Sequence, residues 1–160
     1  MNSLPAPIVQ LYGVSSGLYQ KAVDGLSRKE LLARCGENSN PIIWLAGHLA
    51  YSRCGIITLA GAPRELPWIK LFGRGSQVAD IENYPDISEI LTVWDDVTPA
   101  LMRRFEELSD AELGAPAPRK FPIEDGSLGG ALTFLAYHEA YHVGQMAYIR
   151  KWLGHGGMVG

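Results

Sequence analysis

The chain has 160 residues, of which 47% are hydrophobic and 19% charged, and its formal net charge is −3. This length is enough to bury one sizeable core and too short for two, so we expect residues 1–160 to form a single domain. The 14 lysine and arginine residues are scattered along the chain, whereas nucleic-acid-binding proteins concentrate basic charge in a patch, so composition argues against a nucleic-acid partner.

The first element is expected to be a helix from about Leu4 to Val23. Apolar residues recur there at helical spacing. Gly25 ends the pattern, and Ser27 can cap a further short turn of helix that runs through Leu32. A break of glycine, asparagine and serine residues then separates this region from the next long helix.

The second long helix is expected from Pro41 to Leu59. Asn40 can accept hydrogen bonds from the first free amides, and Pro41 has no amide to leave unpaired, so together they indicate a helix start. Apolar residues recur at helical spacing along this segment, and His48 lies at the edge of the apolar stripe.

The apolar run that contains this helix, residues 41–62, is long enough to suggest a membrane span. It carries His48, Ser52 and Arg53, however, and ionisable side chains are costly in lipid. We therefore expect a buried or amphipathic helix and no association with a membrane.

Residues 61–85 are irregular in sequence and contain three prolines. A connection of this length, at up to ~3.3 Å per residue, can cross the full length of a bundle, whereas antiparallel neighbours usually need only about 2–8 residues. The helices before and after this crossover are therefore expected to be parallel. Trp68 and Phe72 within it could line the mouth of a site or plug the end of the bundle.

The third long helix is expected from Asp86, an acceptable cap, to Leu108, because apolar residues again recur at steps of four and three. Pro99 lies inside this pattern. An internal proline removes one backbone hydrogen bond and clashes with the preceding turn, so a kink or break is expected between Asp95 and Thr98.

A proline-rich loop, residues 109–126, leads to the final helix, which is expected from its cap Ser127 to Leu153. The glycine-rich tail after it is expected to be frayed. Four long helices, with no segment of alternating strand pattern, predict an all-α four-helix bundle with a long crossover between helices two and three.

The final helix carries the main functional signal. Its inward seam repeats every 3.5 residues and consists of Ala131, Leu135, His138, His142, Gln145, Ile149 and Trp152. The middle of this seam is polar, and an unpaired buried polar group costs roughly 2–7 kcal/mol. Two imidazoles one turn apart on an inward face are arranged to share a cation.

A third ligand is needed, because three protein ligands leave one position open for water or substrate at a catalytic zinc-type site. The chain has four histidines, and His155 lies in the glycine-rich tail, where we expect it to be exposed. His48 is the better candidate. A single histidine on an apolar helix is more often a hydrogen-bonded core residue, but the inward pair on a second helix favours a ligand.

Residues 138–142 also spell the metallopeptidase motif H-E-x-x-H, in which the glutamate is the general base. The downstream residues lack the expected third ligand, so peptidase activity is a minor alternative. Glu139 lies about 100° around the helix from His138, and could equally be a carboxylate at the rim or an ion-pair partner. Gln145, Tyr51 and Tyr141 are further candidates for contact with a ligand or substrate.

Two cysteines, Cys35 and Cys54, could form at most one disulfide, and the N-terminus lacks the charged and apolar segments of a secretory leader. The simplest interpretation is a cytoplasmic protein with free thiols. Cys54 lies six residues after His48, on another side of the helix, so we interpret it as a packing residue and not a ligand.

Two segments, Ile43–Ala50 and Tyr137–Gln145, resemble the signatures of the DinB/YfiT-like metalloenzyme superfamily, and the order and spacing of the elements match over nearly the whole chain. The resemblance implies a four-helix bundle of up-down-down-up topology that is commonly dimeric. It also implies a divalent metal held by His48, His138 and His142. Similar proteins include transferases and isomerases that act with low-molecular-weight thiols.

The histidine pattern and the resemblance together lead us to expect a metal-dependent enzyme in which the ion activates water or a small thiol as the nucleophile. A hydrolase or a thiol-dependent transferase is what the resemblance implies. The alternatives are a non-catalytic protein that binds a metal or small ligand, and histidines that bond one another without a metal. Zinc or nickel is the expected ion, and iron or manganese would also fit. The expected partner is a small-molecule substrate. A homodimer is possible, and the sequence does not decide the oligomeric state.

Overall fold

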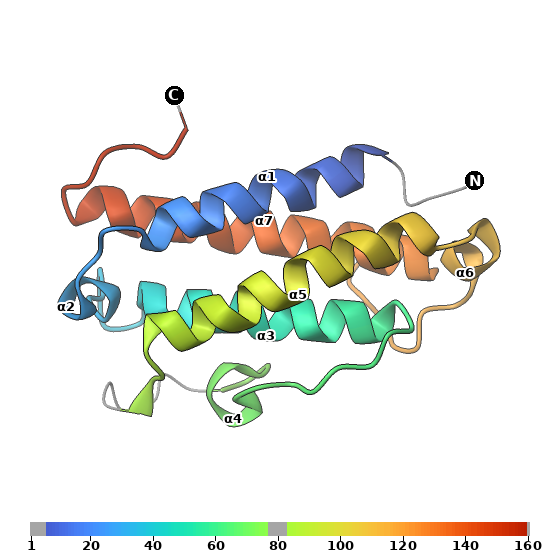
Figure 1. Ribbon diagram of the computed structural model, residues 1–160, viewed down its shortest axis with the longest axis horizontal. Helices are drawn as coiled ribbons and strands as arrows, with labels where there is room; N and C mark the ends of the chain where they lie inside the picture. The colour runs from blue at the N-terminus through green and yellow to red at the C-terminus, as the bar shows by residue number, and fades with distance from the viewer. Residues whose placement is uncertain (1–5, 77–82, 160) are drawn as a thin grey trace.

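Four long helices form the molecule, and a computed structural model describes them within residues 6–76 and 83–159 (Figure 1). They are α1 (Ala6–Val23), α3 (Ile42–Leu59), α5 (Ile87–Glu107) and α7 (Leu128–Trp152). Helices α1 and α7 run in one direction, and α3 and α5 run in the opposite one. The predicted four-helix bundle and its up-down-down-up order are therefore confirmed.

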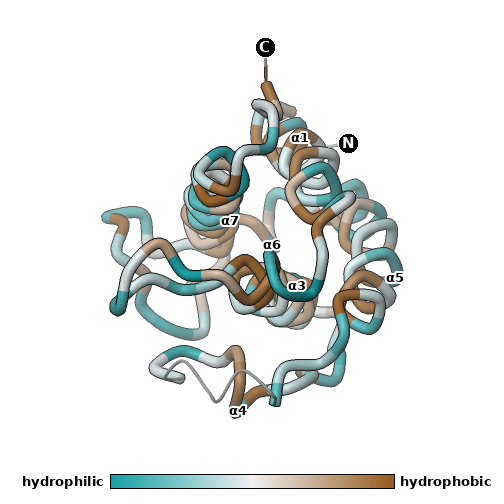
Figure 2. Tube along the Cα trace, turned by 90° about the vertical axis from the view of Figure 1, so that its left-hand side faces the viewer, coloured by the Kyte–Doolittle hydropathy of each residue, from teal (hydrophilic) through white to brown (hydrophobic). Residues whose placement is uncertain are grey.

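Three short helices occupy the connections: α2 (Arg28–Leu31), α4 (Ile69–Phe72) and α6 (Asp110–Gly114). In the end-on view of Figure 2 the four long helices surround one interior, with α3 between α5 and α7. The crossover from α3 to α5 joins two parallel helices, as expected, and α4 packs against α3 on the way. Neither α4 nor α6 was predicted as a helix.

The helix starts agree with the predicted caps, with one correction. Ser127 accepts a hydrogen bond from the Gly130 amide at 3.0 Å at the start of α7. At the start of α3, Pro41 is itself the cap residue, with an extended backbone and no side-chain cap. The prediction that Asn40 caps this helix was therefore wrong by one residue, because proline can hold the extended cap conformation as well as the first helical one.

Of the kink or break expected near Pro99, the break is absent, since α5 is continuous from Ile87 to Glu107. Proline leaves the carbonyl of the residue four positions earlier, Asp95, without its usual amide donor. Both Pro99 and Asp95 are exposed, so water can satisfy that carbonyl and the helix continues.

Apolar side chains fill the bundle in two clusters, one toward each end. The first includes Tyr19, Leu31, Ile42, Leu45, Leu49, Ile90, Trp94, Val143 and Met146. The second includes Tyr12, Ile56, Ile57, Val97, Leu101, Phe105, Ala131, Leu132 and Leu135. On every long helix, polar residues lie between the two clusters.

Arg53 is the centre of that polar layer and is fully buried. Its Nε and Nη2 atoms donate to the two carboxylate oxygens of Glu139 at 2.9 and 2.6 Å. The remaining donors reach Thr98 Oγ1 on α5, and Ser16 Oγ and the Tyr12 carbonyl on α1. One guanidinium thus bonds to groups from three other helices, as a buried cation must if its desolvation is to be offset.

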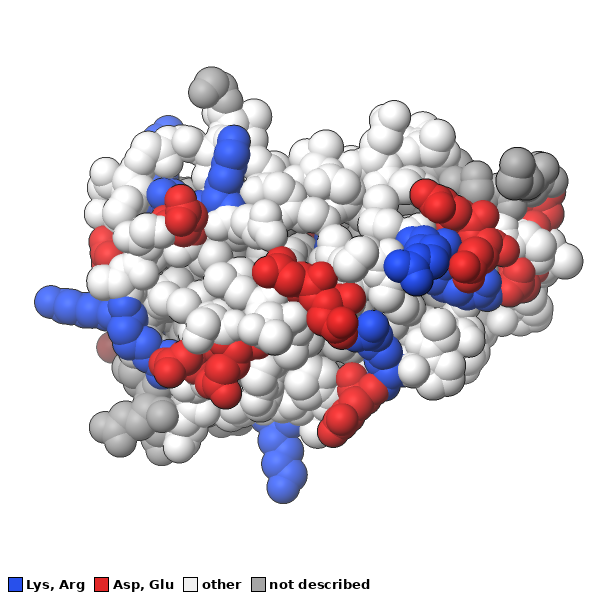
Figure 3. Space-filling view, in the orientation of Figure 1, with Lys and Arg blue, Asp and Glu red and all other residues white. Residues whose placement is uncertain are grey.

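Helix α3 alone is long and apolar enough to cross a membrane within the described residues, yet 67% of it is buried inside the bundle. Its Arg53 is paired within the core, which fits a helix that packs against other helices. On the face seen in Figure 3, acidic and basic side chains are interspersed. Arg104 forms an ion pair with Glu112.

The described part of the tail after α7, residues 153–159, contacts the rest of the molecule, which corrects the prediction of a frayed end. His155 Nε2 lies 2.8 Å from Glu30 Oε1, and Leu153 and Met158 pack against the first apolar cluster. His155 is therefore not the exposed residue that its glycine-rich surroundings indicated. Both cysteines are free thiols, and Cys54 is buried, as predicted.

Candidate metal centre

Three histidines from two helices converge beside the first apolar cluster. His48 lies on α3, and His138 and His142 lie one turn apart on α7. His138 Nε2 is 3.2 Å from His48 Nε2 and 3.1 Å from His142 Nε2. All three side chains are partly buried, and the described residues offer no carboxylate or thiolate to this cluster.

The outward ring nitrogens of two of these histidines have acceptors. His48 Nδ1 lies 2.7 Å from the Phe72 carbonyl oxygen, and His142 Nδ1 lies 2.7 Å from Gln145 Oε1. A carbonyl oxygen can only accept a hydrogen bond, so Nδ1 of His48 carries the proton. In the neutral ring, Nε2 then keeps a free lone pair directed at the other two histidines. The same argument holds for His142.

The spacing of these nitrogens fits a metal ion. Two nitrogens that each lie about 2.0–2.1 Å from zinc at a tetrahedral angle are about 3.3 Å apart, close to the 3.1 and 3.2 Å found between the Nε2 atoms. Three imidazoles suit several divalent transition metals. The residues present therefore form a suitable three-nitrogen site.

His138 differs from its neighbours because its Nδ1 atom is buried and has no hydrogen-bond partner among the described residues. Without a metal, Nε2–H of His138 can be shared between the two facing lone pairs. With a metal, the proton moves to Nδ1. Both arrangements leave Nδ1 unpaired, so the hydrogen bonds of the cluster are incomplete in either state.

Burial also prepares the histidines for coordination. It is the largest cause that lowers the pKa of all three imidazoles below the usual value. The pKa of His138 falls to about 4, through burial and then through the neighbouring His142 and His48. Neutral imidazole, the form that binds metal, is therefore the form present near pH 7.

Aromatic rings frame the cluster. The Trp44 ring stacks on His48, with centroids 4.8 Å apart and planes 7° apart. The Tyr141 ring meets His142 edge-on at 5.2 Å, and Tyr51 lies 6.5 Å from His48. These two tyrosines and Gln145 lie beside the histidines, where the sequence placed them, and Gln145 directly contacts His142.

The carboxylate of Glu139 points into the core and not toward the histidine cluster, although Glu139 follows His138 in the chain. Its carboxylate is buried and bonded to Arg53, so the interpretation as an ion-pair partner is confirmed and the rim position is wrong. Burial raises the pKa of this carboxyl above its usual value, and the bonds from Arg53 oppose that rise. A carboxylate held in this way cannot serve as the general base of the H-E-x-x-H motif.

Two contacts at the site were not predicted. Phe72 contributes its backbone carbonyl to His48, and Trp44 stacks on the same ring. Trp44 precedes His48 by four residues, one helical turn, and this spacing is a readable signal. The carbonyl of Phe72 has no side-chain signature.

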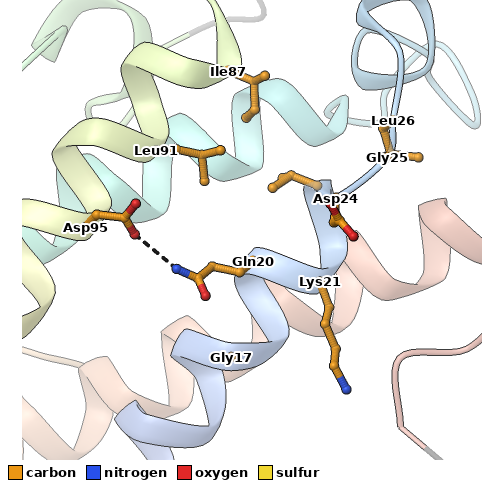
Figure 4. A pocket seen from close by; sticks show the side chains of 10 residues that line it. Gly17, Gln20, Lys21, Asp24, Gly25, Leu26, Ile87, Leu91 and Asp95 are labelled. Atoms are coloured by element: carbon orange, nitrogen blue, oxygen red, sulfur yellow. Dashed lines mark hydrogen bonds between the residues drawn. The ribbon is translucent and has the colours of Figure 1, made fainter.

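A separate cavity of about 620 Å³ lies between α1 and α5 (Figure 4). Gly17 and Gln20 line it from α1, and Leu91 and Asp95 line it from α5. Gln20 Nε2 donates to Asp95 Oδ1 across it at 3.0 Å. None of the three histidines contributes to this cavity, so it is distinct from the candidate metal centre.

Comparison with known proteins agrees with this architecture. The family model of the DinB superfamily matches residues 15–146. Among solved structures, YfiT from Bacillus subtilis, described as a probable metal-dependent hydrolase with an unusual four-helix bundle topology, aligns with a TM-score of 0.65. The sequences are 16% identical, and the alignment covers 94% of this chain and 87% of that one. A search of curated proteins gave no match.

Proposed function

This chain belongs to the DinB superfamily, and we propose that it is a metal-dependent enzyme whose divalent ion is held by His48, His138 and His142. The observation that carries the proposal is the direction of the lone pairs. Acceptors on the outer side of two rings turn their Nε2 atoms toward a common point. Three protein ligands of this kind leave a coordination position for a reactant.

A divalent ion at this point would lower the pKa of a water molecule or a small thiol and so supply a nucleophile near neutral pH. Among the described residues no carboxylate joins the histidine cluster, and the carboxylate of the motif, Glu139, is bonded to Arg53 in the core. This arrangement supports a nucleophile that is generated by coordination and does not support the peptidase mechanism.

The chain's own residues orient the ligands and shape the approach to them. Gln145 and the Phe72 carbonyl fix the tautomers of His142 and His48, an arrangement that raises ligand basicity. Tyr141 is 52% exposed beside His142, so its hydroxyl is available as a donor to a substrate. Tyr141 accepts only a long hydrogen bond from Gln145 Nε2, at 3.4 Å. Its own hydroxyl proton is therefore free to be donated to a substrate oxygen.

The reaction class that we propose is hydrolysis or thiol-dependent group transfer on a small molecule. The description of YfiT as a probable metal-dependent hydrolase favours water as the nucleophile, and zinc or nickel fits a site of three imidazoles, with iron and manganese as further options. A non-catalytic metal-binding role is the alternative, because partly buried ligands of this kind also suit a protein that senses or stores a metal.

Elemental analysis of gently purified protein, followed by assays of the loaded protein toward esters and thiol acceptors, tests the proposal. We expect about one equivalent of metal per chain, loss of that metal in His138→Ala, and metal-dependent turnover. Full metal occupancy with every assay at background would favour the binding role. Less than about half an equivalent of any transition metal, with melting unchanged by chelators, would remove the proposal altogether.

A further inference from the structure

The crossover contributes directly to the candidate metal centre through its short helix α4. The Phe72 carbonyl, at the end of this helix, accepts the Nδ1 proton of His48 at 2.7 Å. One of the three ligands is therefore oriented by a backbone atom of the crossover. The position of that atom depends on how α4 is held against α3.

The side chain of Phe72 is the first anchor of α4. It is fully buried, and the tip of its ring lies over Gly47, the residue before His48. A Cβ atom on Gly47 would lie 2.1 Å from Phe72 Cζ and 2.4 Å from both Cε atoms. The rings of Trp68 and Tyr84 each lie 5.9 Å from the same ring, which limits where it could move.

Trp44 is the second anchor. Its indole Nε1–H donates to the Leu71 carbonyl at 3.1 Å, and its ring stacks on His48. One side chain of α3 thus contacts both the ligand and the helix that orients the ligand. Trp68, at the start of α4, has a left-handed backbone with φ of 51°, which is disfavoured for a bulky residue. Contacts outside the local backbone must therefore hold this turn.

We propose that Phe72 is a positioning residue for the metal centre, and that Gly47 is a glycine because the Phe72 ring occupies the space of its side chain. The ring fixes α4 against α3, and α4 then presents the carbonyl that holds His48 in its metal-binding tautomer. This inference rests on the proposed function, since it gives Phe72 a role toward the same three-histidine site. A purely structural role for Phe72 would alter stability without altering the affinity of the site.

Two glycine substitutions in the same helix separate these roles. Gly47→Ala places a methyl group against the Phe72 ring, whereas Gly55→Ala, also inside α3, meets no atom within 4 Å. We expect Gly47→Ala to raise the zinc Kd about 10–100-fold, the usual effect of losing the outer partner of a histidine ligand. Gly55→Ala is expected to leave the Kd unchanged. Competition titration against a zinc indicator measures both.

A double-mutant cycle tests whether the ring is the cause. Phe72→Ala removes the anchor and should raise the zinc Kd by a similar factor. In that background Gly47→Ala no longer meets the ring, so it should cause no further loss. Additive losses from the two substitutions would contradict the proposal.

A readout that needs no metal comes from imidazole nitrogen–proton NMR of the metal-free protein. We expect a hydrogen-bonded Nδ1 proton on His48 in the wild type and in Gly55→Ala, and its loss in Gly47→Ala. If Gly47→Ala does not fold, Trp44→Phe serves in its place. This substitution keeps an aromatic ring at position 44 and removes the hydrogen bond from the indole to the Leu71 carbonyl. That variant should weaken both the Nδ1 signal and zinc affinity.

Folded Gly47→Ala with the zinc affinity and the His48 signal of Gly55→Ala would overturn the role of Phe72 and leave the metal site intact. If instead the wild type and His138→Ala bind zinc equally, the proposed function fails. The Nδ1 signal would then still report whether the crossover orients His48, so the two failures are distinguishable.

Discussion

Helices α3 and α7 share two polar clusters of opposite character. The Arg53 layer consists of Arg53, Glu139, Thr98 and Ser16, and its central ion pair is fully buried. The histidine cluster consists of His48, His138 and His142, and its members are partly exposed. In the Arg53 layer both carboxylate oxygens of Glu139 are bonded. In the histidine cluster, lone pairs face one another and one ring nitrogen has no described partner.

The difference shows how neighbouring residues of one helix acquire separate roles. His138 and Glu139 are adjacent in the chain, but successive helical residues point about 100° apart, so one reaches the histidine cluster and the other reaches the core. A polar group that is fully bonded inside the protein can only hold the structure together. A polar group with unused bonding capacity at the surface can bind something else.

The largest expected loss of stability comes from a substitution that breaks the Arg53 layer. Glu139→Leu leaves a buried guanidinium without its anion, so we expect about 3–5 kcal/mol of lost stability. For a chain of this size that loss corresponds to a fall in Tm of roughly 6–20 °C. Urea denaturation of the metal-free protein measures it.

The matched control is the double variant Arg53→Met with Glu139→Leu, which removes both charges. It should recover most of the lost stability, because replacing a buried ion pair by apolar residues is often neutral. A double variant as unstable as Glu139→Leu alone would show that the charges are not the cause.

The next largest effect is the loss of zinc-dependent stability when the histidine cluster is disrupted. His138→Ala should abolish stoichiometric zinc binding and leave the metal-free protein folded. At a free zinc concentration of 100 times the Kd, wild-type protein should gain about 2.7 kcal/mol of stability that the variant lacks. Thermal melting with and without zinc measures this gain, and His155→Ala, outside the cluster, is the control that should keep it.

A smaller effect, remote from both clusters, comes from the cap of α7. Ser127→Ala removes the bond to the Gly130 amide and should cost about 1 kcal/mol. Zinc affinity should be unchanged, because the cap lies more than two helical turns before His138 in the chain. A parallel fall in affinity would mean that stability alone controls the site.

The smallest effect is the pH dependence of the metal-free protein. The pKa of His138 is lowered to about 4 in the folded state, against about 6.5 in the unfolded chain. Between these values the unfolded chain binds more protons, so stability is full above pH 6.5 and falls as the pH drops toward 4. Solvent screening at these partly exposed rings keeps the effect modest. His138→Ala should show a shallower dependence in urea denaturation across this range.

The sequence was sufficient for the four helices, for their topology and for the three histidines that meet. Seam spacing placed His138 and His142 inward, and the family resemblance agreed on His48. An ion-pair role for Glu139 was one of the two predicted alternatives, but Arg53 was not identified as its partner and the burial of the pair was missed, although it left a signal. Glu139 has apolar residues one turn away on both sides, Leu135 and Val143, which is typical of a buried position.

The crossover was harder to read. Residues 68–72, between Pro67 and Gly73, are apolar except for Lys70, a pattern that could have indicated a helical turn. The bond from His48 to the Phe72 carbonyl has no such signal, because every residue carries the same acceptor. Backbone contributions of this kind depend on tertiary placement, which neither spacing nor composition encodes.

The Arg53 layer also governs how the helices line up. One guanidinium contacts residues of α1, α5 and α7 at a single level of the bundle. If any of these helices slid along its axis by one turn, Arg53 would lose a bonding partner while it remained buried among apolar side chains. A misaligned bundle would therefore cost more free energy than the loss of packing alone. Grafting the three histidines onto a different scaffold would therefore need a comparable alignment device, because imidazoles displaced by about 1 Å no longer share an ion well.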